Sequence, residues 1–234
     1  MRLIAAFIRH GDYQQLADTP SAHQPYPLNE NGVSQSSNAA DQLYRYITDS
    51  GLDLSPVIDS SHLLRAWQTA QIISDRLKQQ GHGEPKLECF DVLAERGVGS
   101  CVANLTLSQI EAVIDQDPRL AAPPSNWKTN SQYSLPFHGA ESLLAAGQRV
   151  ARHITQRMEQ LTHSCTTDSL KVFVGHGAAF RHAAYHLGIL DFENIAKLSM
   201  FHAQPIYIEY LPDNGWLHIA GEWKVRNDPA KSMD

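Results

Sequence analysis

The chain has few cysteines and no long apolar run. Its three cysteines, Cys89, Cys101 and Cys165, are an odd number without the spacing of metal ligands, which predicts reduced thiols rather than a disulfide framework. No stretch reaches the roughly 18 apolar residues of a transmembrane helix, and the first apolar run lacks the length and cleavage site of a signal peptide. We therefore expect a cytoplasmic protein that does not bind a membrane.

An excess of positive charge is missing as well. The formal net charge is −6 with histidines neutral, so the chain has no electrostatic footprint for nucleic acid. Hydrophobic residues make up 42% and charged residues 19% of the 234 positions, and there is no internal repeat, which favours an ordered globular protein. We expect one domain over residues 1–234, with a loop or helix insertion at about residues 100–138, in which a local basic pocket holds any anionic substrate.

Two short apolar runs each end in a His-Gly pair. Residues 3–8 have the composition of a strand buried on both faces and are followed by Arg9-His10-Gly11, and residues 170–175 form a similar run before His176-Gly177. Ligands bind beyond the carboxyl ends of strands in open α/β sheets, so these residues are well placed to handle an anion. Each motif alone is also compatible with a polar cap on a strand.

Short strands and helical segments alternate along the rest of the chain. This alternation predicts an α/β fold, a three-layer sandwich with a mostly parallel central sheet and helices on both faces. Residues 118–136 carry four prolines and predict a substrate-side flap, and the last eight residues predict a loose tail. Two helices are predicted in the first third of the chain. One is capped by Asn29 and has Val33, Ala40, Leu43 and Ile47 on one face, and the other is capped by Ser60 or Ser61, runs to about Gln80 and buries Trp67, Ala70, Ile73 and Leu77. The other predicted elements are the strands Val57–Ser60 and Leu87–Leu93, a helix with a capping box at Thr106–Gln109, a long helix after Gly139–Ser142, a helix from Ala178 to Gly188, and a hairpin over Pro205–Ala220.

An arginine begins the second of these helices. Arg65 lies in its first turn, where a guanidinium can bind a phosphate with two hydrogen bonds near the positive end of the helix dipole. An exposed or ion-paired surface arginine is the alternative. His182 and His186 share one helix face but have no evident third ligand, so a packed or solvated pair is favoured over a zinc site.

Taken together in this order, the motifs resemble the histidine phosphatase superfamily, also called the phosphoglycerate mutase-like family. The resemblance spans roughly residues 3–182 and depends on the Arg-His-Gly motif, the Arg65-Ala66-x-x-Thr69-Ala70 helix start, the turn that carries Glu95, and the late His-Gly-x-x-x-Arg motif. Asn29 stands where the family usually has threonine, and both residues can cap a helix. A Gly-Glu-Ser segment of the family corresponds to residues 139–142, where Glu141 is expected in the first turn of the long helix, with a site residue as the alternative.

The resemblance implies a metal-independent phosphatase that works through a phosphohistidine and needs no cofactor. His10 would be the nucleophile, and Arg9, Arg65 and His176 would bind the phosphoryl group. Glu95 would be the general acid and base, although a solvent-facing turn glutamate is the alternative. A neutral imidazole is a competent nucleophile near pH 7, and clustered positive charge should depress the pKa of His10 and keep it neutral.

Two other functions remain open. A cofactor-dependent phosphoglycerate mutase usually has Glu-Ser after Arg-His-Gly and two adjacent arginines in the insertion, whereas this chain has Asp12-Tyr13 and, between residues 105 and 136, the single arginine Arg119 and Lys128. A phosphatase is therefore favoured. A phosphate- or phosphopeptide-binding module without turnover is the other alternative. The partner is expected to be a small phosphorylated substrate or a phosphoprotein, and the sequence sets neither its identity nor the oligomeric state.

Overall fold

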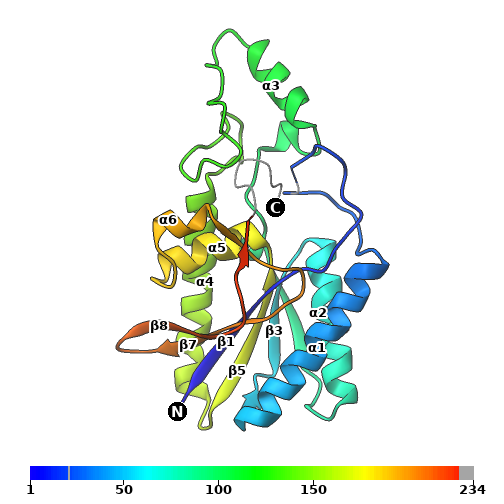
Figure 1. Cartoon of the computed structure of the whole chain (residues 1–234), viewed down its shortest axis with the longest axis vertical. Coiled ribbons are helices and arrows are strands. Elements are labelled where there is room, and N and C mark those ends of the chain that lie inside the picture. The colour runs from blue at the N-terminus through cyan, green and yellow to red at the C-terminus, as the bar shows by residue number, and fades with distance from the viewer. Residues whose placement is uncertain (21, 227–234) are drawn as a thin grey trace.

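A seven-stranded sheet forms the centre of the protein. The structure, a computed structural model, describes residues 1–20 and 22–226, and the predicted tail lies outside these residues. The strand order is β4-β3-β5-β1-β7-β8, with β2 paired to β5. Strands β1 to β5 pair in parallel, whereas β7 joins β1 antiparallel and forms a hairpin with β8 at the edge. The expected α/β sandwich with a mostly parallel sheet is confirmed (Figure 1).

The elements follow the predicted alternation of strands and helices. The strands of the sheet are β1 (Leu3–Arg9), β2 (Asp53–Leu54), β3 (Val57–Ser61), β4 (Lys86–Phe90), β5 (Ser169–Gly175), β7 (Ile206–Leu211) and β8 (Gly215–Ala220), and β6 (Leu198–Ser199) pairs separately with β9 (Lys224–Val225). The α-helices are α1 (Glu30–Ser50), α2 (Leu64–Gln79), α3 (Leu107–Asp115), α4 (Leu143–Ser164), α5 (Gly177–His186) and α6 (Phe192–Ile195), and short 3-10 turns cover Asp91–Leu93 and Ser100–Val102.

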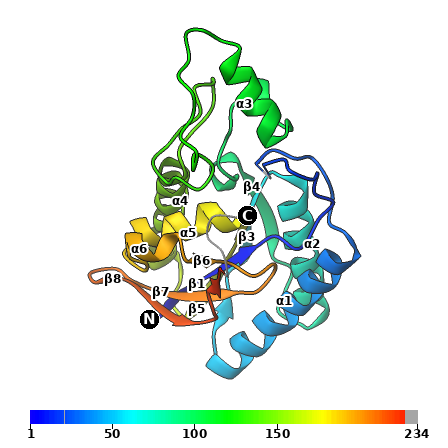
Figure 2. The same cartoon turned by 45° about the horizontal axis from the view of Figure 1, so that its top comes forward.

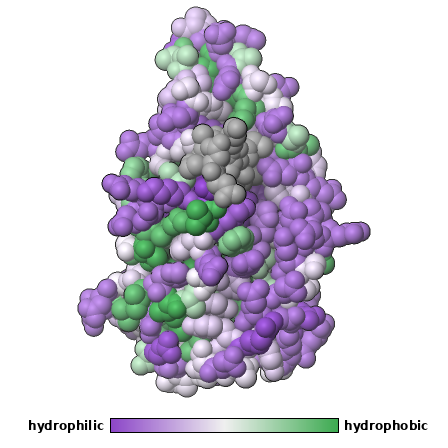
Figure 3. Space-filling model, in the orientation of Figure 1, coloured by the Kyte–Doolittle hydropathy of each residue, from purple (hydrophilic) through white to green (hydrophobic). Residues whose placement is uncertain are grey.

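Alternate side chains of β1 enter two separate cores, one on each face of the sheet. Ile4, Ala6 and Ile8 pack with α1 and α2, whereas Leu3, Ala5 and Phe7 pack with α4 and α5 (Figures 1 and 2). All seven residues of β1 are buried. An apolar run without period-two alternation therefore marks a strand covered on both faces. The outer face over α1 is almost wholly hydrophilic in Figure 3, as expected for an amphipathic helix.

The insertion forms a third, smaller core above the carboxyl edge of the sheet. Helix α3 and the loops around it rise from the main body (Figures 1 and 2). Ile110, Trp127 and Leu135 are almost completely buried within this part, together with Ala22 from the loop after β1. Residues 118–136 are irregular, as predicted, but they pack as a folded cap.

Several local predictions were wrong. Val33 and Trp67 are 46% and 40% exposed, because each lies at the border of the stripe that its helix buries. Gly32 and Ser36 are buried beside Val33, and Ala66 and Thr69 are buried beside Trp67. Helix α2 is preceded by Leu63 without a side-chain cap, and strand β4 stops at Phe90 before a 3-10 turn. The long helix begins at Leu143 after the capping Ser142, so Glu141 precedes the first turn instead of lying in it.

The core under α4 contains a buried charged cluster. Asp59, fully buried on β3, accepts hydrogen bonds from Lys171 on β5 and Arg157 on α4, at 2.5 Å and 2.8 Å. His153 on α4 lies 2.9 Å from the same carboxylate, and Arg157 also binds Glu88. This Asp59 cluster connects two strands to a helix through charge, and it lies apart from the strand ends.

Candidate active site

The two His-Gly motifs lie side by side at the carboxyl edge of the sheet. Arg9 pairs with Gly175 across the β1–β5 ladder, and the His10 amide donates to the Gly175 carbonyl at 2.9 Å. The ring centroids of His10 and His176 are 5.1 Å apart. The expectation that both strands bring a histidine to one edge is confirmed.

The hydrogen bonds of His10 define its tautomer. Arg65 Nε, which can only donate, lies 3.1 Å from His10 Nε2, so Nε2 is the acceptor and carries the lone pair. His10 Nδ1 lies 2.7 Å from the Gly11 carbonyl, to which it donates its proton. A neutral imidazole with a lone pair on Nε2 is the form that a nucleophile requires.

The surroundings of His10 favour this neutral form. The side chain is buried, with 3% of the residue exposed. Burial lowers the pKa of His10 well below the ordinary value for histidine, and the charge of Arg65 lowers it further. The direction agrees with the sequence-based expectation, and it keeps His10 unprotonated at neutral pH.

Arg65 is the central cation of the site. It is fully buried, begins α2 beside the end of β3, and donates to both histidines, at 3.1 Å to His10 and 3.2 Å to His176. Its two amino groups also donate to the Gln24 and Ala22 carbonyls of the loop after β1, at 3.0 Å and 3.2 Å. The loop thus closes over the guanidinium.

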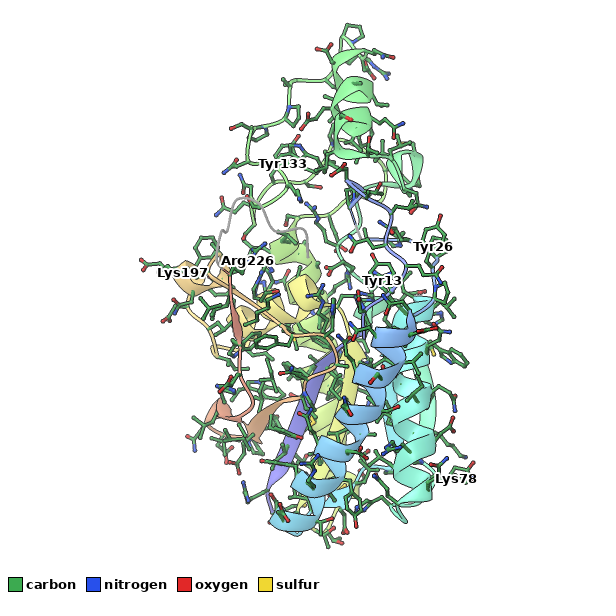
Figure 4. The ribbon with its side chains drawn as sticks, turned by 45° about the vertical axis from the view of Figure 1, so that its right-hand side comes forward. Tyr13, Tyr26, Lys78, Tyr133, Lys197 and Arg226 are labelled. Atoms are coloured by element: carbon green, nitrogen blue, oxygen red, sulfur yellow. The ribbon has the colours of Figure 1, made fainter. Side chains whose placement is uncertain are left out.

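A tyrosine covers another side of this cation. The Tyr13 ring lies 4.6 Å from the Arg65 guanidinium carbon and packs edge-on against His10, with 5.3 Å between centroids. In Figure 4, Tyr13 lies beyond the carboxyl end of the sheet, whereas Lys78 near the end of α2 lies at the opposite end of the molecule. The aromatic face adds a favourable contact for the guanidinium.

His176 is fixed by a serine of the neighbouring strand. Since Arg65 donates to Nδ1, the proton of the neutral ring is on Nε2, which lies 2.9 Å from Ser61 Oγ. Burial lowers the pKa of His176 well below its ordinary value, and the charge of Arg65 adds to this effect. The ring is therefore neutral and held on both sides.

Arg9 and a third histidine come together at the end of β1. Arg9 Nη1 donates to the Met200 carbonyl at 3.1 Å, and the Ala203 amide donates to the Arg9 carbonyl at 2.9 Å. Between these contacts the chain brings the His202 ring to 5.6 Å from His10. His202 thus lies against the proposed nucleophile on the side of the loop after β6.

Two glycines allow the Arg-His-Gly loop to touch α1. A Cβ on Gly11 would lie 2.5 Å from the Gly32 carbonyl oxygen, and a Cβ on Gly32 would lie 1.9 Å from the Asp12 carbonyl oxygen. The Gly11 amide donates to Thr69 Oγ1 at 3.0 Å. Glycine is required here for close backbone approach, and the contact fixes the loop that carries His10.

Glu95 lies in a turn at the base of the insertion. It is 6% exposed, and one carboxylate oxygen accepts the Arg96 amide at 2.8 Å. Burial lowers the pKa of Arg65, and the negative charge of Glu95 acts in the opposite direction, which places Glu95 within electrostatic reach of the central cation. Arg96 is also buried, with its guanidinium carbon 6.0 Å from the Trp127 ring centre.

The structure therefore brings His10, Arg9, Arg65 and His176 together and places Glu95 nearby. Among the described residues, no group of three or more His, Cys, Asp or Glu side chains can hold a metal ion. His182 Nε2 lies 3.0 Å from Ser131 Oγ in the cap, and His186 Nε2 lies 2.9 Å from the Leu144 carbonyl. Each of these two histidines thus has a hydrogen-bonding partner within the protein.

Sequence reasoning missed four residues that shape the site. The sequence could have indicated Ser61 and Thr69 as site residues, because Ser61 follows a predicted strand and Thr69 lies one helical turn after Arg65 in the motif. Tyr13 lies in a loop without periodicity. His202 follows a two-residue strand that is too short to show a pattern.

The sequence was also compared with protein-family models and with curated proteins. Residues 5–220 match the sequence model of the histidine phosphatase superfamily (branch 1). A search of curated proteins found no match. No helix in residues 1–20 and 22–226 has the length and apolarity needed to cross a bilayer.

Many solved structures share the fold at low identity. A structure described as mycobacterial hydrolase 1 is 22% identical with a TM-score of 0.67, over 97% of this chain and 98% of that one. The native structure of mycobacterial glucosyl-3-phosphoglycerate phosphatase is 23% identical with a TM-score of 0.65, over 97% and 98% of the two chains. The alpha-ribazole phosphatase from Shigella flexneri is 20% identical with a TM-score of 0.65, over 100% of both chains.

Proposed function

The chain belongs to the histidine phosphatase superfamily, and from this membership we propose that it is a metal-independent phosphatase that hydrolyses a phosphate monoester through a phosphohistidine. The observation that carries the proposal is the arrangement around His10 Nε2. Its lone pair faces the fully buried Arg65, and His176 and Arg9 are adjacent. A nucleophile beside fixed positive charge is what phosphoryl transfer needs, because catalysis depends on positioning and on stabilising charge at the equatorial oxygens.

The reaction has two steps in this proposal. His10 Nε2 attacks phosphorus, the bond to the leaving oxygen breaks, and Glu95 gives its proton to that oxygen. Glu95 then accepts a proton from water, which attacks the phosphohistidine and releases phosphate and His10. Arg9, Arg65 and the His176 side chain hold the phosphoryl oxygens in both steps.

The substrate is proposed to be a small phosphorylated molecule or a phosphoprotein. Two structural neighbours are described as phosphatases of glucosyl-3-phosphoglycerate and of alpha-ribazole, which supports a monoester with a sizeable leaving group. A mutase is less well supported, because Arg119, the single arginine between residues 105 and 136, is bound to Asp117 at 2.6 Å and 2.9 Å. A screen of phosphorylated metabolites with the purified protein would identify the substrate.

Hydrolysis of p-nitrophenyl phosphate should be insensitive to metal chelation. The proposed charge clamp consists of Arg9, Arg65 and His176, so EDTA is expected to leave the rate unchanged. The measurement is release of nitrophenol before and after dialysis against EDTA. Loss of activity that a divalent ion restores would contradict the proposal and would direct attention to His182 and His186. Binding of phosphate without release of nitrophenol would favour a binding module.

Replacing the proposed acid should have an effect that depends on the leaving group. Glu95→Gln is expected to lower kcat/KM for alkyl phosphates by about 10²–10⁴-fold. The effect on p-nitrophenyl phosphate should be much smaller, because nitrophenolate leaves without a proton. The measurement is kcat/KM for both esters, since this ratio includes transfer to the enzyme but not the later hydrolysis. Equal loss for the two esters would show that Glu95 is not the acid.

A further inference from the structure

The turn that carries Glu95 has little regular structure to hold it. It follows the 3-10 turn Asp91–Leu93 at the end of β4, and the ladder of the sheet stops at Phe90. An acid is useful only if its oxygen stays within hydrogen-bonding distance of the leaving oxygen. Something outside the sheet must therefore fix the position of this turn.

Arg149 supplies that support from helix α4. Its Nη2 donates to the Glu95 carbonyl at 3.1 Å, and its Nη1 donates to the Val92 carbonyl at 2.8 Å. One guanidinium thus holds the backbone on both sides of Ala94. The same cation is close enough to His176 to contribute to the lowering of that pKa, after burial and Arg65, so it lies near the phosphate pocket.

Glu141 holds the arginine and the far end of the turn. Its carboxylate accepts a bidentate pair of hydrogen bonds from Arg149, at 2.6 Å from Nη2 and 3.1 Å from Nε. The same carboxylate accepts the Gly97 amide at 3.1 Å, while the Glu141 amide donates to the Gly97 carbonyl at 3.0 Å. A Cβ on Gly97 would lie 2.7 Å from the Gly139 carbonyl oxygen, so the two segments are in close backbone contact.

We propose that Arg149 and Glu141 are positioning residues for Glu95, and that they fix the acid relative to the leaving group. This inference rests on the proposed function. Arg149 ties the turn to helix α4, and Glu141 ties it to the base of the cap just before that helix begins. A planar guanidinium with fixed donors suits this task, because a bidentate pair restricts orientation as well as distance. Misplacement of a reacting group by about 1 Å can cost on the order of 10²-fold in rate.

The pair differs from other ion pairs of this chain in what it holds. Arg76 and Asp41 form a similar two-pronged pair, at 2.7 Å and 2.8 Å, between α2 and α1. That pair is also partly exposed, at 43% and 27% of the side chains against 23% and 22% for Arg149 and Glu141, and it contacts no part of the proposed site. It therefore provides a matched control for the loss of a bidentate ion pair.

The test uses two conservative variants, Arg149→Lys and Glu141→Gln. Lysine keeps the positive charge but cannot donate a bidentate pair of hydrogen bonds, and glutamine keeps the shape of glutamate but loses its negative charge. Both are expected to lower kcat/KM for an alkyl phosphate by about 10–100-fold, with a much smaller change for p-nitrophenyl phosphate. Arg76→Lys should change neither ester. Thermal melting of each variant confirms that the compared proteins are folded.

A double variant makes the role of Glu95 explicit. In the Glu95→Gln background, Arg149→Lys should cause no further loss with the alkyl ester, because the group that it positions is gone. Equal losses for both esters, or a full additional loss in the double variant, would overturn the positioning role.

The proposed function is judged separately in the same experiment. Radiolabelled phosphate trapped on the enzyme from p-nitrophenyl phosphate reports the phosphohistidine. Its absence from the wild-type protein would contradict the two-step mechanism. Its presence together with an unchanged dependence on the leaving group in Arg149→Lys would overturn only the positioning role.

Discussion

The His10→Ala variant is expected to lose turnover by on the order of 10⁴-fold or more, because removing a nucleophile from a two-step enzyme removes its reaction path. Wild-type enzyme quenched while it hydrolyses a radiolabelled ester should retain label that is acid-labile and alkali-stable, the signature of phosphohistidine. The variant should retain none. Its phosphate pocket should still bind, since Arg65 and Arg9 are unchanged and reach this pocket from two different elements.

A control histidine is available elsewhere in the sheet. His218 on the edge strand β8 is exposed, pairs with Ile208 in the middle of β7, and is separated from β1 by that strand, so His218→Ala should keep both label and turnover. Substantial residual turnover in His10→Ala would mean that water attacks the ester directly or that another residue carries the phosphoryl group. The pocket would then survive as a binding site, but the two-step mechanism would not.

The second large effect concerns stability. Asp59→Asn is expected to lower the free energy of unfolding by about 3–5 kcal/mol, because it leaves Lys171 buried without its carboxylate. Urea denaturation measures this change. Asp41→Asn, which breaks the partly exposed pair with Arg76, should cost about 1 kcal/mol or less. Similar losses in the two variants would show that the Asp59 cluster contributes no more than a surface pair.

The same variant should alter the pH dependence of unfolding. Burial alone would raise the pKa of Asp59, but the hydrogen bond from His153 and the charge of Lys171 outweigh it and hold the pKa below its usual range. A carboxyl group whose pKa is lowered by folding contributes stability above its unfolded pKa of about 3.9, and this contribution is lost as the pH falls through the folded value. The difference in stability between wild type and Asp59→Asn should therefore shrink below about pH 4. A difference that stays constant in acid would contradict this assignment.

The strands that are buried on both faces could be predicted, because burial requires a run of apolar residues that is visible in the sequence. Residues 3–8 are apolar and residues 170–175 are mostly apolar, with the single charge of Lys171, so their burial and the meeting of His10 and His176 at one edge followed from the pattern. Val33 and Trp67 show the limit of the same reasoning. Helical periodicity gives the direction of each side chain but not the width of the stripe that the neighbouring layer covers, and both residues lie at the border of that stripe.

The supporting contacts of the site were not predictable in this way. Arg149 is seven residues into a helix whose start was recognised, yet nothing in the helical pattern indicates that its guanidinium reaches the Glu95 carbonyl. Ser61 was considered as a helix cap and instead accepts a hydrogen bond from His176. Such contacts depend on how separate elements are packed, and a single sequence carries no local signal for that packing. The catalytic roles themselves stay predictions until the variants are measured.

The position of β1 in the sheet has a consequence for synthesis of the chain. Its two neighbours are β5 and β7, which both lie in the last third of the sequence. During translation this apolar strand is therefore made well before either of its partners. An unpaired strand of this kind favours aggregation, so chaperones that shield nascent apolar segments should matter for this protein. The candidate active site and protection from aggregation would then arise in the same step, when β5 reaches β1.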